Sequence, residues 1–414
     1  MTIVVRPFGD GFSDRESALR ALLDVDESAF GEAAGENLDS PALAVLEEDR
    51  TLLAWDGDHV VGASSVYTLD LSTPGGGSVP TAGVTWVGVR PTHRRQGAMR
   101  SMLAQLHAQA SQRHEPVAAL WAAQSGIYQR FGYGVASRLM RTVLPRSAGT
   151  LFRAPTDESI RLHMVAPGED RELTQQVYDA MRIRRPGFPV IDEKWHRRLV
   201  DDPADQRGGA SPLTTVVAMD EGGPRGYVRY ALKPNWSEGY ADGTVQVRHM
   251  LALDPAASAT LWRFLIEFDL FGSVEAWNTP IDDPLQHWIE DPRRGTRQVE
   301  DQLYVKLLDV GGALTRRSYR APIDIVLEVQ DDDVPANVGR WRLSGDADGA
   351  VCDRTTDPAD LSMDVRSLGA VYLGGPTFLD HQSAGWVEEL TPGAASAASA
   401  AFAHYPAPHS PFVF

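Results

Sequence analysis

Short apolar runs alternate with segments of helical periodicity along most of the chain. In the first third, the runs that predict β-strands lie at residues 2–6, 52–55, 60–69, 83–89, 117–121 and 138–143. Between them, the spacing of apolar residues predicts helices at residues 13–23 and around Met99, Leu103 and Leu106. This order predicts the α+β class, with a mixed α/β sheet of roughly six strands and helices on its faces.

The alternation starts again after a segment rich in Pro, Ser, Gly and Ala at residues 145–155. The strands and helices of this second cycle are predicted at residues 160–165, 169–181, 214–219, 226–232, 245–252 and 257–268. A third part begins around Tyr304, and its elements are predicted at residues 323–329, 339–343, 350–353, 361–373 and 392–404. Because 414 residues exceed the usual size of one hydrophobic core, we expect three domains, at residues 1–148, 149–303 and 304–414.

The charge balance is strongly acidic. The chain has 56 acidic and 39 basic side chains, which gives a formal net charge of -17. This charge argues against nucleic acid or an anionic membrane as the main partner and favours cationic ligands. The same net charge is explained equally well by an acidic surface that serves only solubility.

The chain shows no sign of export or of a structural metal. Cys352 is its single cysteine, so no intramolecular disulfide can form, and the 11 histidines show no zinc-ligand spacing. Residues 1–11 lack an apolar signal core, and no run of about 18 apolar residues could span a bilayer. We expect a cytoplasmic protein with no metal and no membrane partner.

A basic turn follows the apolar strand at residues 83–89. Arg94 and Arg95 precede Gly97, where the next helix is predicted to begin. The first N–H groups of a helix lack intrahelical acceptors and carry a partial positive charge, which together suit a diphosphate. We interpret the turn as a pyrophosphate-binding loop. The alternative is a solvated basic helix start, which most short arginine clusters are.

The turn resembles the acetyl-coenzyme A loop of the GNAT superfamily of N-acetyltransferases. That pattern is Arg or Gln, two residues, Gly, one residue, then Gly or Ala. Arg94 and Gly97 fit it, whereas Met99 departs from its last position. The resemblance implies acetyl-CoA as co-substrate.

Acetyl transfer to an amine requires a base for the amine and a proton for the leaving thiolate. The strand at residues 83–89 holds no acidic side chain and no histidine, so the base must come from elsewhere. Tyr128 begins a short helix after the strand at residues 117–121, and it is our candidate general acid. The alternative is a tyrosine that packs the sheet edge, like Phe131 and Tyr133.

The end of the chain, residues 408–414, is apolar and rich in proline, so we expect packing to hold it.

Larger segments resemble the enhanced intracellular survival (Eis) acetyltransferases of actinobacteria. The similar segments are residues 80–97, 127–134 and 368–375, together with the terminal Phe. The resemblance covers the whole chain and implies tandem GNAT-like domains, of which only the first binds acetyl-CoA, followed by a sterol-carrier-like domain that ends in the active site. It implies that the α-carboxylate of Phe414 is the base and Tyr128 the acid. It also implies a hexamer.

The same resemblance implies the binding positions. Those expected to hold acetyl-CoA are Val87, Gly88 and Val89 on the strand, Arg94, Arg95, Gln96, Gly97, Ala98 and Met99 in the turn, and Ala123 or Ser125 beyond the next strand. Trp86 and Phe30 are expected to line the amine pocket, and Glu32 or Asp26 to attract the cation. Val413 stands where some relatives place an acid.

We therefore expect an N-acetyltransferase that transfers acetyl directly, within a ternary complex, to a cationic amine of polyamine-like or aminoglycoside type. Acetylation of protein lysines is the alternative within this class. A non-catalytic lipid-binding or scaffold protein is the alternative outside it, and it would require an apolar tunnel in the third domain. In the second domain, residues 253–256 replace the basic turn, and Asp254 would repel a diphosphate, so we expect a structural role there.

Overall fold

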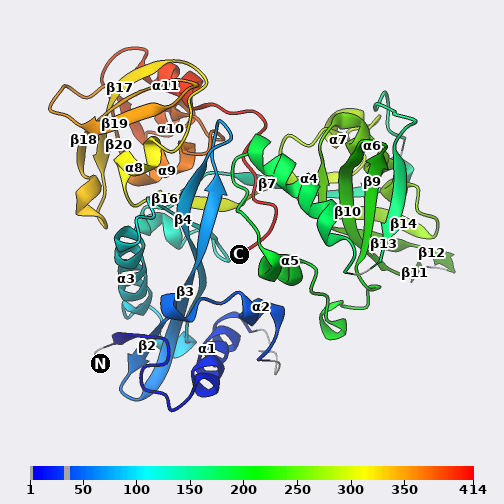
Figure 1. The fold of residues 1–414 in the computed structure, drawn as a ribbon, viewed down its shortest axis with the longest axis horizontal. Helices are drawn as coiled ribbons and strands as arrows, with labels where there is room; N and C mark the ends of the chain where they lie inside the picture. Colours follow the sequence, from blue (N-terminus) through cyan, green and yellow to red (C-terminus); the bar gives the residue numbers. More distant parts are fainter. Residues whose placement is uncertain (1–2, 32–37, 149, 167, 238) are drawn as a thin grey trace.

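The computed structural model describes residues 3–31, 38–148, 150–166, 168–237 and 239–414, and it contains three main sheets (Figure 1). The first sheet has seven strands in the order β1-β2-β3-β4-β5-β16-β6. Their bounds are β1 Val4–Pro7, β2 Leu52–Asp56, β3 His59–Ser72, β4 Ser78–Val89, β5 Val117–Trp121, β16 Leu303–Leu307 and β6 Gly134–Val135. Helices α1 (Arg15–Phe30) and α3 (Ala98–Gln112) cover its two faces, and together they form what we call the first unit.

Helix α1 is longer than the predicted segment at residues 13–23. It begins where the Asp14 side chain accepts a hydrogen bond from Ser17 N at 2.8 Å, and it ends at Gly31, whose φ of 75° lies in the left-handed region. Asp24, Asp26 and Glu27 therefore still lie on the helix. Two short segments, α2 (Pro41–Ala44) and the 3₁₀ turn η1 (Glu48–Arg50), lead into β2.

The second sheet also has seven strands, in the order β15-β7-β14-β13-β10-β9-β8. Their bounds are β15 Thr296–Asp301, β7 Arg138–Pro145, β14 Phe271–Pro280, β13 Gly243–Ala252, β10 Gly223–Lys233, β9 Thr214–Asp220 and β8 Arg161–Val165. The helices of this second unit are α4 (Arg171–Arg184), α5 (Glu193–Leu199), α6 (Pro255–Ile266) and α7 (Leu285–Trp288). A small hairpin of β11 (Trp236–Ser237) and β12 (Tyr240–Ala241) projects from it.

The prediction that residues 138–143 complete the first sheet is wrong. Strand β7 lies between β14 and β15 in the second sheet, and β16 takes the open place beside β5 in the first. The exchange is stable because β7 is paired along both edges and β16 pairs with both β5 and β6. Strand β7 precedes residue 148 but belongs to the second sheet, and β16 begins at residue 303 but belongs to the first. The domain boundaries expected after residues 148 and 303 stay a prediction.

The third sheet has the order β19-β18-β17-β20-β21. Its strands are β17 Ile323–Gln330, β18 Gly339–Gly345, β19 Ala350–Arg354, β20 Leu361–Asp364 and β21 Val387–Glu389. The helices of this third unit are α8 (Val310–Leu314), α9 (Val365–Val371), α10 (Phe378–Ser383) and α11 (Ala394–Phe402). The single helix predicted at residues 361–373 is wrong, because Asp364 ends a paired strand and its carboxylate caps α9 through Arg366 N at 2.7 Å.

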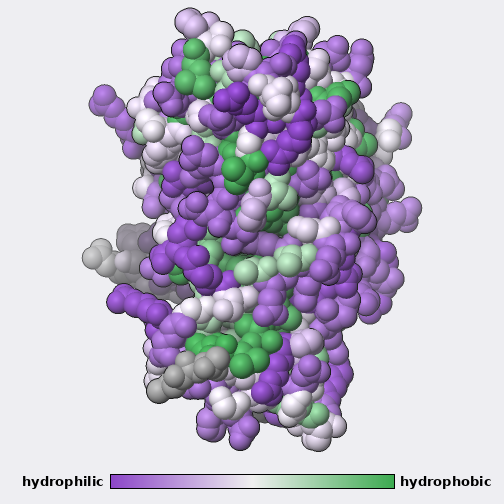
Figure 2. All heavy atoms as spheres, turned by 90° about the vertical axis from the view of Figure 1, so that its left-hand side faces the viewer, coloured by the Kyte–Doolittle hydropathy of each residue, from purple (hydrophilic) through white to green (hydrophobic). Residues whose placement is uncertain are grey.

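After α11, the chain leaves the third unit and runs between the other two units. Its end lies beside β4 and close to α5 (Figure 1). Figure 2 shows the face formed by the first and third units, which is mostly hydrophilic with separate apolar patches. Among the described residues, no helix has the length and apolar character to cross a bilayer.

Candidate active site

Strands β4 and β5 run parallel and then separate. Their pairing is limited to Thr81–Gly83 against Val117–Ala119, and the ladder between the two strands stops there. The gap opens at the carboxyl ends of two parallel strands, which is where ligands bind in open α/β sheets. Beyond these pairs, the main-chain groups of β4 that face β5 have no partner on that strand.

A bulge in β4 lies at the edge of this gap. Ser65 pairs with Thr85 and Ala63 pairs with Gly88, so two residues of β4, Trp86 and Val87, stand opposite one residue of β3. Trp86 has a φ of 52°, which is unusual for a bulky residue. A bulge leaves main-chain groups without ladder partners, so the segment can bind the amide-rich arm of a ligand.

The predicted pyrophosphate-binding turn has the geometry of an anion site. Gly97 is the N-cap of α3 with a φ of 89°, and this glycine has no side chain to cap the first N–H groups of the helix. Arg95 has a φ of 63°, so two residues close together adopt left-handed backbone. The side chains of Arg94, Arg95 and Gln96 are exposed. The Arg94 guanidinium donates to Ala29 O at 3.3 Å, at the end of α1. Uncapped N–H groups beside two exposed guanidinium groups are well suited to a diphosphate.

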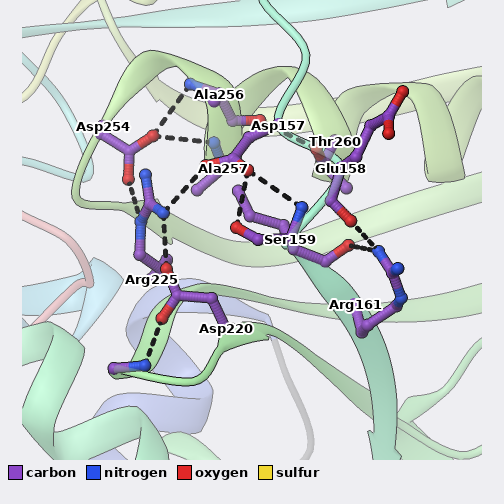
Figure 3. A network of polar contacts seen from close by, with 12 residues as sticks. Asp157, Glu158, Ser159, Arg161, Asp220, Arg225, Asp254, Ala256, Ala257 and Thr260 are labelled. Carbon is purple, nitrogen blue, oxygen red and sulfur yellow. Dashed lines mark hydrogen bonds and ion pairs between the residues drawn. The ribbon is translucent and has the colours of Figure 1, made fainter.

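The equivalent turn of the second unit, at residues 253–256, has a structural role: it caps helix α6. Asp254 caps α6 by accepting hydrogen bonds from Ala256 N at 2.9 Å and Ala257 N at 3.0 Å (Figure 3). Asp254 Oδ2 accepts a hydrogen bond from Arg225 Nε at 2.8 Å, and Arg225 also donates to Asp157 and Asp220. The helix N-terminus that could bind a phosphate already holds a carboxylate. This agrees with the structural role expected for residues 253–256.

Tyr128 lies where β5 leads into the 3₁₀ turn η3 (Tyr128–Phe131). Its side chain is buried, and it contacts Tyr133 edge to face with ring centroids 6.0 Å apart. Burial raises the pKa of Tyr128 to about 12. The phenol therefore keeps its proton at neutral pH, so it can act as an acid and not as a base.

The start of the chain's last segment is anchored by the second unit. Arg185 donates to Ala407 O at 2.6 Å, Asp282 accepts from Ala407 N at 2.8 Å, and His409 N donates to Pro186 O at 2.9 Å. The tail packs so closely there that a Cβ on Gly187 would lie 2.8 Å from His409 O. These contacts hold the tail in the place where Figure 1 shows its end.

A chain of aromatic contacts joins the tail to the β4 bulge. The Phe412 ring lies 5.5 Å from the Trp195 ring, and Trp195 lies 4.9 Å from Tyr67. Tyr67 Oη in turn accepts a hydrogen bond from Trp86 Nε1 at 3.0 Å. Phe414 is only 4% exposed, and Trp86 and Trp121 pack against the hydrophobic cluster that contains it. The terminal residue is thus buried in the same hydrophobic cluster against which Trp86 of β4 and Trp121 of β5 pack.

The expected amine-binding residues are only partly brought together. Trp86 lies in the bulge, and the last turn of α1 lies beside it, because a Cβ on Gly88 would be 3.3 Å from Ala29 Cβ. Phe30, which ends α1, is 47% exposed, and Asp26 is half-buried on the same helix. Glu32 lies outside the described residues.

The remaining expected contacts lie near the turn and beyond β5. Val87 and Val89 are half-buried, Ala98 is buried in the first turn of α3, and Met99 packs against the core cluster of the first unit. Ala123 and Ser125 are both exposed in the segment before Tyr128. Tyr304 Oη donates to Ser125 O at 3.5 Å, which ties this segment to β16.

Sequence reasoning missed the residues that hold the tail. Gln302, Asn278 and Ser410 form a buried polar cluster, and Trp195 and Tyr67 supply the rings described above. An isolated Gln between two strands carries no sequence signal of such a role. The proline-rich, apolar tail was the one sign that something holds the terminus.

Three family models match the chain. Two describe an acetyltransferase (GNAT) domain, at residues 14–136 and 189–307, and the third describes a sterol carrier protein domain at residues 310–411. An uncharacterized N-acetyltransferase of Streptomyces avermitilis is 41% identical over 387 residues, which cover 93% of this chain and 95% of that protein.

Two further similarities concern mycobacterial proteins. The N-acetyltransferase Eis of Mycobacterium tuberculosis is 33% identical over 331 residues, 78% of this chain and 77% of that protein. The crystal structure of Eis1 from Mycobacterium abscessus matches with a TM-score of 0.81 and 31% identity, and the match covers 100% of both chains.

Proposed function

The chain belongs to the Eis family of GNAT N-acetyltransferases, which use acetyl-CoA, and from this premise we propose that it acetylates cationic small-molecule amines within a ternary complex. The observation that carries the proposal is that Phe414 is buried at the end of a clamped tail, which reaches the end of β5 through the Trp121–Ser410 hydrogen bond. A carboxylate placed there supplies the base that the strand at residues 83–89 lacks.

The proposed chemistry uses the two ends of this site. The amine enters as an ammonium ion, and the Phe414 carboxylate takes one proton so that the nitrogen lone pair can attack the thioester carbonyl carbon. A C–N bond forms and the C–S bond breaks. Tyr128 gives its proton to the departing thiolate, which leaves as free CoA. The second proton lost by the acetylated nitrogen restores the Tyr128 phenol, and the proton on the Phe414 carboxylate is released to solvent. Because the pKa of Tyr128 is raised to about 12, proximity in a dry site must help this transfer to a thiolate of lower pKa.

The proposed acetyl-CoA contacts follow the geometry of the first unit. Val87, Gly88 and Val89 would hold the pantetheine arm through their main chain, and the turn from Arg94 to Met99 would hold the diphosphate. Two observations support this assignment: the uncapped start of α3 and the left-handed Arg95 and Gly97. Ala123 offers no side-chain hydrogen bond, so any such contact beyond β5 would come from Ser125.

The proposed acceptor is a polyamine-like or aminoglycoside amine. The net charge of -17 raises the local concentration of such cations. Val413, which is 46% exposed, brings no charge to the end of the tail. The aromatic contacts around Phe412 and Trp86 would instead supply a surface for cation–π contact with an ammonium group.

The test is a screen of free CoA release against polyamines, aminoglycosides and lysine peptides, followed by measurement of mass shifts of about 42 Da, the mass that one acetylation adds. The proposal predicts acetylated small amines. An enzyme that modifies only the lysine peptides and leaves the small amines unchanged would contradict it.

The apolar residues of the third unit form an ordinary core. Leu361, Val365, Leu368, Val371 and Leu373 are all 0–2% exposed and pack in one cluster with the third sheet. This packing favours the enzyme over a lipid-binding scaffold. A cytoplasmic location and a hexameric assembly stay predictions.

A further inference from the structure

The side-chain amide of Gln302 pairs with the main chain of Ser410. Gln302 Oε1 accepts a hydrogen bond from Ser410 N at 2.8 Å, and Gln302 Nε2 donates to Ser410 O at 2.9 Å. Gln302 is 1% exposed and Ser410 is 0% exposed. A planar amide that engages both polar groups of one residue fixes the position and the orientation of that residue.

The remaining polar atoms of Ser410 are also satisfied. Asn278 Nδ2 donates to Ser410 O at 3.1 Å, and Trp121 Nε1 donates to Ser410 Oγ at 3.2 Å. Ser410 Oγ itself donates to Phe412 O at 3.0 Å. Asn278 of the second unit and Trp121 of β5 thus hold Ser410 in place. Through its hydrogen bond to Phe412 O, Ser410 also fixes the main chain at Phe412.

Gln302 is itself fixed by its neighbours. Ser137 Oγ donates to Gln302 Oε1 at 2.7 Å, and Leu303 N donates to Ser137 Oγ at 3.2 Å. Gln302 Nε2 also reaches Asn278 Oδ1 at 2.7 Å. The residue lies between β15 of the second sheet and β16 of the first, so it sits where the two sheets exchange strands.

Asn278 lies at an interruption of the second sheet. The last β13–β14 pair is Val247 with Ala276, and the β14–β7 register shifts between Ala276 and Thr279. Asn278 is therefore released from the ladder and turns its amide to the tail. The unit without an acetyl-CoA loop of its own thus supplies part of the support for the chain end.

From these contacts we infer that Gln302 is a positioning residue for catalysis: with Ser410 it sets where the Phe414 carboxylate lies. The inference rests on the proposed role of that carboxylate as the base. Four residues beyond Ser410 can span about 14 Å when extended, so a tail released at Ser410 could move its end by many ångströms. A displacement of about 1 Å from the reacting atoms can cost on the order of 100-fold in rate.

The test is Gln302→Met, which keeps the length of the side chain and removes both of its hydrogen-bonding groups. We expect kcat to fall by about 100-fold, whereas the dissociation constant of acetyl-CoA changes by less than about 2-fold. The matched control is Gln382→Met. Gln382 is a half-buried glutamine of α10 that bonds Glu389 within the third unit, and its substitution leaves both quantities unchanged.

A double-mutant cycle separates positioning from general damage. The second change adds one glycine after Phe414, which displaces the carboxylate by about one residue length, 3.8 Å. In this extended chain, Gln302→Met costs no further activity, because the base is already out of place. Release of the terminal phenylalanine by a carboxypeptidase gives an independent readout, and we expect it to be at least about 10-fold faster for Gln302→Met than for Gln382→Met.

Each outcome decides a separate point. Unchanged kcat in Gln302→Met, or an equal further loss in the extended chain, overturns the positioning role while the base assignment stands. Full activity of the extended chain with Gln302 intact overturns the base assignment itself. If Gln302→Met loses kcat and also its thermal transition, Ser410→Ala decides: we expect about a 10-fold loss of kcat with a normal thermal transition, and unchanged kcat would overturn the positioning role.

Discussion

Trp121 donates a hydrogen bond from Nε1 to Ser410 Oγ at 3.2 Å, across 289 positions of the sequence. Trp121 ends β5, the strand that leads to Tyr128. The same bond therefore ties the chain end, with its carboxylate, to the strand that positions the proposed acid. The two groups that the proposed mechanism places on either side of the substrate therefore share one structural support.

The first prediction concerns the loop. Gly97→Ala places a side chain at a φ of 89°, where left-handed backbone costs about 1–2 kcal/mol. We expect the dissociation constant of acetyl-CoA, measured by calorimetry, to rise by about 10-fold, because the first N–H groups of α3 shift. Gly393 is the matched control: it is also an uncapped N-cap, its φ is 88°, and at both glycines an added Cβ would meet no described atom within 4 Å.

Gly393→Ala should lower the melting temperature by a similar amount and leave acetyl-CoA binding unchanged. If both variants bound acetyl-CoA like the unsubstituted chain, the turn would not be the diphosphate site.

The second prediction concerns Tyr128. Tyr128→Phe removes the proton donor, and we expect kcat to fall by roughly 100-fold with little change in acetyl-CoA affinity. The control is Tyr240→Phe, since Tyr240 is 78% exposed on the β11–β12 hairpin. Equal rates for the two variants would remove Tyr128 from the mechanism.

The pH dependence of kcat gives a separate check on Tyr128. An ordinary phenol loses half of its acid form near pH 10, as its pKa of about 10 requires. Burial raises the pKa of Tyr128 to about 12, so the protonated form persists and kcat should not decline as the pH rises through 10. A decline with an apparent pKa near the ordinary value, absent in Tyr128→Phe, would contradict the buried position of this group.

The third prediction concerns acceptor binding. Trp86→Leu removes the ring at the bulge and its bond to Tyr67 but keeps an apolar side chain. We expect the KM for the amine to rise by about 10-fold and the dissociation constant of acetyl-CoA to change by less than about 2-fold. Trp236→Leu is the control, because Trp236 is 69% exposed on the β11–β12 hairpin of the second unit. If only the dissociation constant of acetyl-CoA rose and the KM for the amine stayed the same, Trp86 would belong to the acetyl-CoA site and not to the amine site.

Local features of the fold could be predicted from the sequence. The hairpin of β2 and β3, the strand before Arg90 and the helix after Gly97 all follow from apolar periodicity and turn residues over short distances. A structural role for residues 253–256 also followed from the negative charge of Asp254, which would repel a diphosphate, whereas its capping of α6 is seen only in the structure.

Long-range pairing could not be predicted. Strands β7 and β16 exchange between two sheets, and nothing in their own residues distinguishes one sheet from the other. The same holds for Gln302, whose partners Ser137 and Ser410 lie 165 and 108 positions away. Tyr128 was named from its place after the strand at residues 117–121, and Phe414 through family resemblance. The residues that hold the tail required the three-dimensional structure.

The most direct test of the account moves the terminal carboxylate without altering any side chain. A chain that carries one extra glycine after Phe414 is compared with the unextended chain and with Phe414→Leu, which keeps the carboxylate in place. The account predicts that kcat of the extended chain falls by at least about 100-fold, that acetyl-CoA binds within about 2-fold of normal, and that Phe414→Leu keeps most of the activity. An extended chain that acetylates amines at the normal rate would contradict it.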